Sequence, residues 1–164
     1  IFVSRGGWDH HSSLIQPQQN LLAELTPALT AFQKGLENCG LADSVITFSA
    51  SDFARTLRSN GSGSDHAWGG NQFVMGGPVA GGQVLGRYPS LAFDSADDVG
   101  RGGRILPTTS VDALVAELLL WFGLEGRAKF EQILPNLSNF YDVRNAEAHD
   151  PSTLPIGFLK PDTY

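Results

Sequence analysis

Two short clusters of aspartate and histidine are the first features of this sequence that could do chemistry. One is the Asp-His-His run at residues 9–11, and the other is the Asp-His pair at residues 65–66. Aspartate and histidine are ligands for zinc and other divalent transition metals. Glycine and tryptophan flank both clusters, in GGWDHH and GSDHAWGG, which favours one shared metal site. The alternative remains that these residues only satisfy backbone groups in glycine-rich loops.

The spacing of residues 9–11 predicts which of their side chains face the same side of the chain. Consecutive residues of an extended chain face opposite sides, and residues two positions apart face the same side. We therefore predict that Asp9 and His11 point into one site, while His10 points away from it or supports it from behind. We further predict that acids and histidines from all of the polar clusters converge there, although more than fifty positions of sequence separate them.

A third polar cluster, SASDFART at residues 49–56, places Asp52 and Arg55 three positions apart. A guanidinium group offers a planar fork of N–H donors that suits a phosphate or sulfate group. Two interpretations of Arg55 are open at this point. Either it binds an anionic substrate, or it pairs with Asp52 and closes a turn.

The elements that would position these residues follow from the spacing of apolar side chains. Apolar and β-branched runs predict buried strands at 1–4, 44–51 and 72–77. Helical spacing predicts helices at 17–38, 111–122 and 126–134. Gly40 and Gly123 are placed as C-terminal stops. The stretch 57–71, rich in glycine, serine and asparagine, is expected to be a loop.

This order of elements predicts an α/β fold with a mostly parallel sheet flanked by helices. The predicted strands are apolar throughout instead of alternating, as in strands that are covered on both faces. Ligands of such sheets bind beyond the carboxyl ends of the strands, where the polar clusters are expected. We expect one domain at residues 1–144 and a surface tail at 145–164, which contains three prolines.

Composition excludes several classes of function. The net charge is −6 and there is no basic run, so we do not expect nucleic acid as a partner. Cys39 is the single cysteine, which excludes an internal disulfide or a cysteine-based metal site. No apolar run approaches the roughly 18 residues of a membrane span. The chain begins with the apolar run IFVS and no initiator methionine, so we expect upstream residues that contact it.

Four segments of the chain resemble the C-terminal part of the DUF1501 family, over about residues 1–140. They are GGWDHHS, PQQNLLAELTPALTAF, VITFSASDFARTLRSNGSGSDHAWGGNQFVMGGPVAGGQVLGRYPSL and GRGGRILPTTSVDALVAELLLWFG. The family is grouped with the alkaline phosphatases and sulfatases, which are metal-dependent hydrolases built on an α/β sheet. The resemblance implies the C-terminal portion of an alkaline-phosphatase-like fold. It also implies export by a twin-arginine signal, and therefore a periplasmic or secreted location.

The family pattern can be followed position by position in this sequence. Gly-(Trp/Phe)-Asp-Thr-His reads GWDHH here, with His10 where threonine is common. Ser-Glu-Phe-Gly-Arg-Thr reads SDFART, with Asp52 in place of glutamate, and Gly-Thr-Asp-His-Gly reads GSDHAWG. Asp52 keeps the acid but is one methylene shorter than glutamate. The resemblance implies these metal ligands: Asp9, His11, Asp52, Asp65 and His66.

The function that the resemblance implies is metal-dependent hydrolysis of a small anionic ester, either a phosphate or a sulfate. One or two divalent ions, with zinc as a candidate, would bind at the ligands, and Arg55 would meet the substrate. The superfamily's nucleophile lies early in its fold, so it is expected upstream of this chain. Two other functions stay open. One is an exported, non-catalytic protein that binds a metal or another ligand, and the other is a structural component of an assembly.

Overall fold

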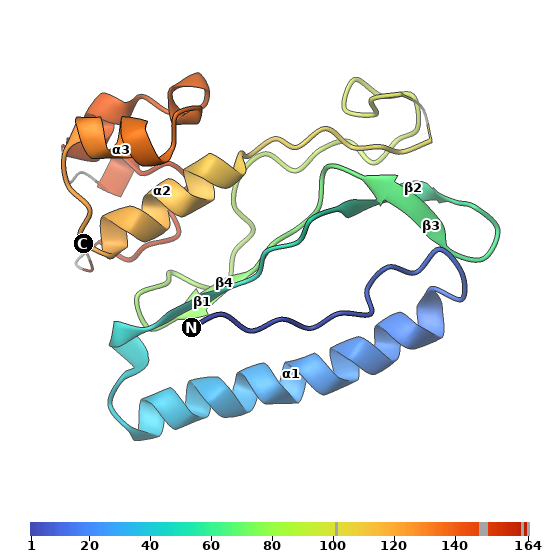
Figure 1. Cartoon of the computed structure of the whole chain (residues 1–164), viewed down its shortest axis with the longest axis horizontal. Helices are drawn as coiled ribbons and strands as arrows, with labels where there is room; N and C mark the ends of the chain where they lie inside the picture. The colour runs from blue at the N-terminus through green and yellow to red at the C-terminus, as the bar shows by residue number, and fades with distance from the viewer. Residues whose placement is uncertain (101, 148–150, 162, 164) are drawn as a thin grey trace. The chain divides into compact units, whose positions relative to one another are not determined.

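The computed structural model of the chain describes residues 1–100, 102–147, 151–161 and 163 (Figure 1). The chain forms two compact units, and each is described here by itself. The first unit consists of Ile1–Ala42, Ala50–Gln72 and Pro89–Leu106. The second unit consists of Asp43–Ser49, Phe73–Tyr88 and Pro107–Tyr164.

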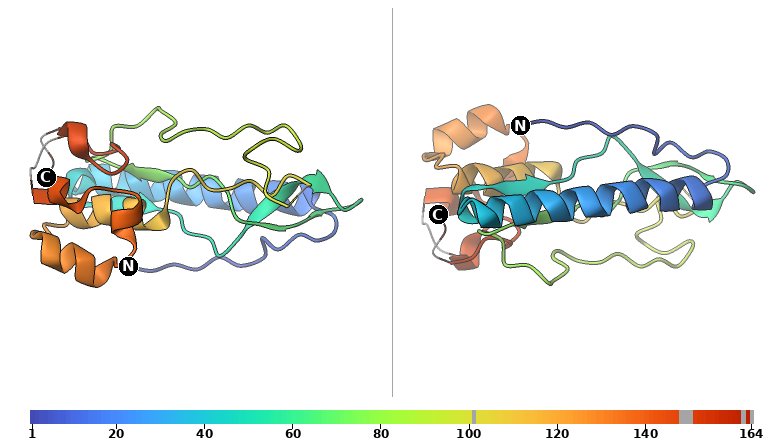
Figure 2. Two further views of the ribbon diagram at one scale, coloured as in Figure 1. Left: turned by 90° about the horizontal axis from the view of Figure 1, so that it is seen from above. Right: turned by 90° about the horizontal axis from the view of Figure 1, so that it is seen from below.

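The long helix α1 (Ile15–Asn38) is the largest element of the first unit. It confirms the helix predicted at 17–38. The extended N-terminal segment runs beside it (Figure 2), and Nη2 of Arg5 contacts Oε2 of Glu24 at 2.6 Å. The helix ends at the predicted glycine: Gly40 has a φ of +69°, and the N–H of the next residue, Leu41, donates to the carbonyl oxygen of Leu36.

A hairpin of two strands, β2 (Ala54–Ser59) and β3 (Ser64–Ala67), forms the other part of the first unit that matters for the site. The strands pair antiparallel, with Arg55 opposite His66. Oδ1 of Asn60 accepts the N–H groups of Ser62 and Gly63 and so closes the turn. The expectation that 57–71 is a loop is therefore wrong for residues 57–59 and 64–67, which lie in strands.

The second unit contains a second small sheet. Its strands are β1 (Ile46–Phe48) and β4 (Val74–Gly76), which pair antiparallel with Thr47 opposite Met75. These strands confirm the positions predicted at 44–51 and 72–77. A short 3₁₀ helix, Ala42–Ser44, precedes β1.

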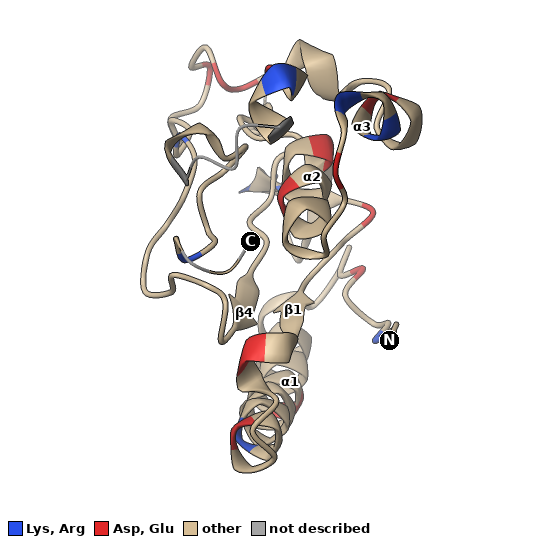
Figure 3. Cartoon of the chain, turned by 90° about the vertical axis from the view of Figure 1, so that its left-hand side faces the viewer, with Lys and Arg blue, Asp and Glu red and all other residues tan. Residues whose placement is uncertain are grey.

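The remaining helices of the second unit are α2 (Val111–Trp121) and α3 (Arg127–Ile133), as the sequence predicts. Oγ of Ser110 accepts the N–H of Ala113 and caps α2. α3 carries both basic and acidic residues (Figure 3). Three short 3₁₀ helices follow at Leu137–Asn139, Val143–Glu147 and Pro151–Thr153.

The prediction of a mostly parallel sheet, and with it of an alkaline-phosphatase-like fold, is wrong. Both sheets have two antiparallel strands, and the described residues contain no parallel pair. Residues 1–4 form no strand, and the side chains of Ile1 and Phe2 are exposed. Two parallel strands are joined by a crossover connection, which is usually a helix. The connection from β1 to β4 along the chain contains the hairpin of β2 and β3 instead. Apolar composition indicated where strands lie but not the direction in which they pair.

The core of the second unit includes part of the predicted surface tail. Phe130 and Leu137 are fully buried beside α2. Phe158 and Leu159 are also buried, with 2% and 4% of their surface exposed. The expectation that 145–164 is a surface tail is therefore wrong for these two residues. Prolines in the sequence suggested an open segment, whereas apolar side chains between them anchor it.

Candidate metal centre

Asp9, His11 and His66 bring three potential metal-ligand atoms together. Oδ1 of Asp9 lies 3.0 Å from Nδ1 of His11 and 2.7 Å from Nε2 of His66. One ligand atom from each residue lies within 4.8 Å of the others, and all three residues are exposed. Within the part of the chain that the structure describes, no other group of three or more acids, histidines or cysteines is so arranged. We call these three residues the triad.

The hairpin turn sets the position of the segment that carries two members of the triad. Nδ2 of Asn60 donates to the carbonyl oxygen of His11 at 3.0 Å. Gly63 allows the two segments to approach, because a Cβ atom built there would lie 2.4 Å from the carbonyl oxygen of His10. Residues 8–11 are therefore docked on the hairpin by the side chain of Asn60 and by a close backbone approach at Gly63 that only a glycine permits.

Arg55 joins the same two segments through its guanidinium group. Nη2 donates to Oδ1 of Asp9 at 2.6 Å and to the carbonyl oxygen of Trp8 at 3.0 Å. Nη1 donates to the carbonyl oxygen of Ser64 at 2.6 Å. The side chain is 19% exposed, and Nε is buried without a partner among the described residues. The sequence left a substrate anion or Asp52 as partners, and the structure pairs Arg55 with Asp9.

Aromatic contacts restrict the ring of His66. The ring of Phe53 stacks on it, with centroids 4.2 Å apart and planes inclined by 14°. The guanidinium carbon of Arg55 lies 4.9 Å from the centre of the same Phe53 ring. Phe53 therefore packs against both side chains that contact the Asp9 carboxylate from the hairpin.

The electrostatics of the triad favour the ionised form of Asp9. The pKa of its carboxyl group is lowered, and the hydrogen bond with His66 is the largest cause. Desolvation acts in the opposite direction, while the hydrogen bond from Arg55 and the charge of His11 lower the pKa further. A metal ion binds the carboxylate form and not the acid. Asp9 is thus held in the form that a metal ligand requires.

The donor atoms of the triad fit a divalent transition metal. Two imidazole nitrogens and one carboxylate oxygen are ligands of zinc sites that have three protein ligands and leave a fourth position for water or substrate. The exposure of all three residues leaves the site accessible from solvent. The arrangement can therefore bind an ion and still admit a small molecule beside it.

Comparison with known proteins places the chain in a family. Residues 1–133 match the family described as "Protein of unknown function (DUF1501)". The chain belongs to the DUF1501 family. No curated protein and no solved structure matches it. The triad and Arg55 lie within the matched residues, and the resemblance drawn from the sequence is confirmed at the level of the family.

Two acids predicted as ligands of this DUF1501 protein are not part of the triad. Asp65 precedes His66 on β3 but is not part of the group of ligand atoms. Its Oδ1 accepts Nδ2 of Asn60 at 3.2 Å. Asp52 is exposed in the segment before β2, outside the group. His10 is also outside it, with Nε2 buried and without a partner among the described residues.

Sequence reasoning missed Phe53 and did not predict that Arg55 supports the triad. Phe53 and Arg55 are two positions apart at the start of the hairpin, but their shared role needs the stacking with His66 to be visible. The sequence did carry one usable signal, the Asn60-Gly61 pair, which favours a turn between two strands. It was not read as a hairpin because the flanking residues are polar and lack apolar alternation.

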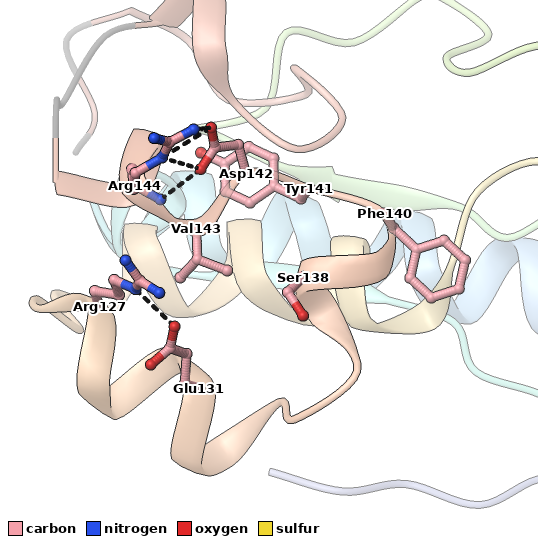
Figure 4. Close-up of a pocket in the computed structure, with 8 residues that line it drawn as sticks. All are labelled: Arg127, Glu131, Ser138, Phe140, Tyr141, Asp142, Val143 and Arg144. Carbon is pink, nitrogen blue, oxygen red and sulfur yellow. Dashed lines mark hydrogen bonds and ion pairs between the residues drawn. The ribbon is translucent and has the colours of Figure 1, made fainter.

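A pocket of about 350 Å³ lies in the second unit of this DUF1501 protein and contains none of the predicted site residues (Figure 4). Its charged side chains are paired: Arg127 with Glu131 at 2.6 Å and Arg144 with Asp142 at 2.5 Å.

Among the described residues, no helix combines the length and the apolar character needed to cross a membrane.

Proposed function

We propose that the triad binds one divalent transition-metal ion, with zinc as the first candidate, and that this DUF1501 protein hydrolyses a phosphate or sulfate ester. The observation that carries the proposal is the convergence of one carboxylate oxygen and two imidazole nitrogens within 4.8 Å. The metal part of the proposal rests on this geometry. The hydrolytic part rests on the resemblance of the motifs to the DUF1501 family, which is grouped with the alkaline phosphatases and sulfatases.

The chain's own residues would prepare the site for such a reaction. Asp9 is kept ionised by the hydrogen bonds with His66 and Arg55. The two histidines must lose their protons to become ligands, so binding is stronger at higher pH. A bound metal ion would polarise an ester oxygen and lower the pKa of a coordinated water. The exposure of the triad allows a small ester to reach it.

A second candidate function is binding of a metal or ligand without catalysis. One observation favours it: the side chains of the triad make their hydrogen bonds and ion pairs with Arg55 and with one another. Among the described residues, no hydroxyl or thiol group that could act as a nucleophile contacts them. Hydrolysis would then require a nucleophile from elsewhere or an activated water.

Turnover of a generic aryl phosphate and a generic aryl sulfate separates the two candidates. The protein is loaded with zinc and compared with the same protein after chelation and with the Asp9→Asn variant. Hydrolysis of either ester that is lost on chelation and in the variant supports the hydrolase. Metal binding without turnover of either ester rejects the hydrolase and leaves the binding function.

A further inference from the structure

We infer that Arg55 is a positioning residue for the proposed metal site: it fixes Asp9 as a ligand through one oxygen, and it does not bind the substrate anion. The inference rests on the proposed function, because it needs a metal ion at the triad. Its first support is the contact of Nη2 with Oδ1 of Asp9 at 2.6 Å.

The hydrogen bonds of Arg55 leave no pair of parallel N–H groups free to bind an anion. A guanidinium holds a phosphate or sulfate with two parallel N–H groups. Both edges that offer such a pair include Nη2, and both N–H groups of Nη2 are used, by Asp9 and by the carbonyl oxygen of Trp8. Nε, on one of these edges, is buried. The guanidinium is therefore turned into the protein.

The contacts of Asp9 divide its two oxygens. Oδ1 receives Arg55 and also contacts His11 and His66. Among the described residues, no hydrogen bond reaches Oδ2. By holding Oδ1, Arg55 orients the carboxylate oxygen that faces Nδ1 of His11 and Nε2 of His66. Groups that orient a metal ligand in this way typically change metal affinity by about 10- to 100-fold when they are removed.

Arg55 also fixes the distance between the two segments that carry the triad. The carbonyl oxygen of Trp8 belongs to the segment of Asp9, and that of Ser64 belongs to the strand of His66. Without these bonds the two sets of ligands are held together less tightly, by contacts nearer the turn such as that of Asn60 with the carbonyl oxygen of His11. Positioning therefore predicts weaker metal binding when the fork is lost.

The positive charge of Arg55 would have the opposite effect. A cation close to the site repels a metal ion, so if charge dominated, its removal would tighten binding. The two effects thus differ in sign for Arg55→Met. Arg55→Lys keeps the charge but loses the fork, and positioning predicts that it also weakens binding.

The experiment is a titration of zinc, and of cobalt with its visible spectrum, against the wild-type protein and the variants Arg55→Lys and Arg55→Met. Arg58→Met is the matched control, because Arg58 also lies on β2 but its guanidinium faces the ring of Phe93 at 5.0 Å. We expect the Arg55 variants to lose about 10- to 100-fold in affinity, with an altered cobalt spectrum. The control should match the wild type.

Three results would overturn the inference. Unchanged affinity in both Arg55 variants, or tighter binding in Arg55→Met, contradicts positioning. Metal affinity unchanged but inorganic phosphate no longer bound by the loaded variants would assign Arg55 to the anion. If Arg55→Met does not fold, the lysine variant alone decides. If the wild-type protein binds no metal, both the proposed function and this inference are rejected. The other results reject the inference alone and leave the metal site in place.

Discussion

At the scale of single residues, the site depends on how closely two segments approach. Gly63 is the point of contact, since a Cβ there would lie 2.4 Å from the carbonyl oxygen of His10 and 2.5 Å from the carbonyl carbon of His11. Neither backbone group can move without moving the triad. The glycine is required by space and not by its backbone angles, because no left-handed φ occurs at this position.

Gly63→Ala should therefore separate the segment 8–11 from the hairpin. We expect it to lower the free energy of unfolding by about 1–3 kcal/mol, as overpacking does, and to weaken zinc binding. Gly6→Ala is the matched control, because a Cβ at Gly6 meets nothing within 4 Å. Denaturant unfolding and a zinc titration measure both effects. Identical behaviour of the two variants would contradict the role given to Gly63.

A second residue-scale prediction concerns acid titration in the second unit. The hydrogen bonds from the Arg144 side chain, followed by that from its backbone N–H, lower the pKa of Asp142 from 3.8 to about 2. Because the folded pKa is below the unfolded one, the resulting stabilisation is present above about pH 4 and is lost as the pH falls toward 2. NMR titration of the carboxyl carbon should show this low pKa in the wild type.

Arg144→Gln removes the main cause and should return the pKa of Asp142 toward its ordinary value. Arg127→Gln is the control, since the charge of Arg127 is the smallest of the causes. A wild-type carboxyl group that titrates near pH 4 would show that the Asp142–Arg144 pair does not persist in solution.

At the scale of elements, hydrogen bonds to one side chain of α2 connect this helix to the segment 156–159 in the second unit. Glu117 is fully buried, and its two carboxylate oxygens accept the backbone N–H groups of four consecutive residues at 2.6–3.0 Å. Hydrogen bonds to a charged acceptor are stronger than neutral ones. The segment that carries Phe158 and Leu159 into the core is therefore attached to α2 by one side chain.

Removing this carboxylate should release the segment. We expect Glu117→Ala to cost at least about 2 kcal/mol in the free energy of unfolding, because buried N–H donors lose their acceptor. Amide hydrogen exchange at Phe158 and Leu159 should accelerate in the same variant. Glu125→Gln, at an exposed position of the same unit, should stay within about 0.5 kcal/mol of the wild type. Equal exchange rates in the wild type and in Glu117→Ala would contradict the claim that Glu117 holds the segment 156–159 on α2.

The sequence predicted elements better than it predicted how they pair. Helices were recognised because their signals are local: apolar spacing and the glycine stops at Gly40 and Gly123. Strand pairing is non-local, and the apolar runs that became β1 and β4 carry no information about direction. The hairpin of β2 and β3 escaped notice because its residues are polar on both faces near the turn.

At the scale of the whole molecule, part of the predicted site comes together and part does not. Asp9 and His11 were placed on one side of an extended chain by their spacing, and they lie together with His66. The resemblance implied Asp65 as a ligand, but its carboxylate accepts a hydrogen bond from the side-chain amide of Asn60 and lies outside the group. Arg55 was read as a residue for a substrate, since its partners Asp9, Trp8 and Ser64 are distant in sequence or are backbone atoms.

Family membership and the triad address different questions about this chain. The match over residues 1–133 establishes the DUF1501 family, whose description names no activity. The triad, in contrast, supports a specific chemistry that a single binding experiment can test. The central claim is therefore that Asp9, His11 and His66 hold a metal ion.

Zinc stoichiometry tests this claim most directly. The wild-type protein and the His66→Ala variant are loaded with zinc, freed of excess ion and analysed for metal per chain. We predict one tightly bound ion per wild-type chain and none in the variant, with circular dichroism unchanged because an exposed ligand adds little to the core. A wild-type protein without zinc, or a variant that keeps the wild-type stoichiometry, would contradict the claim.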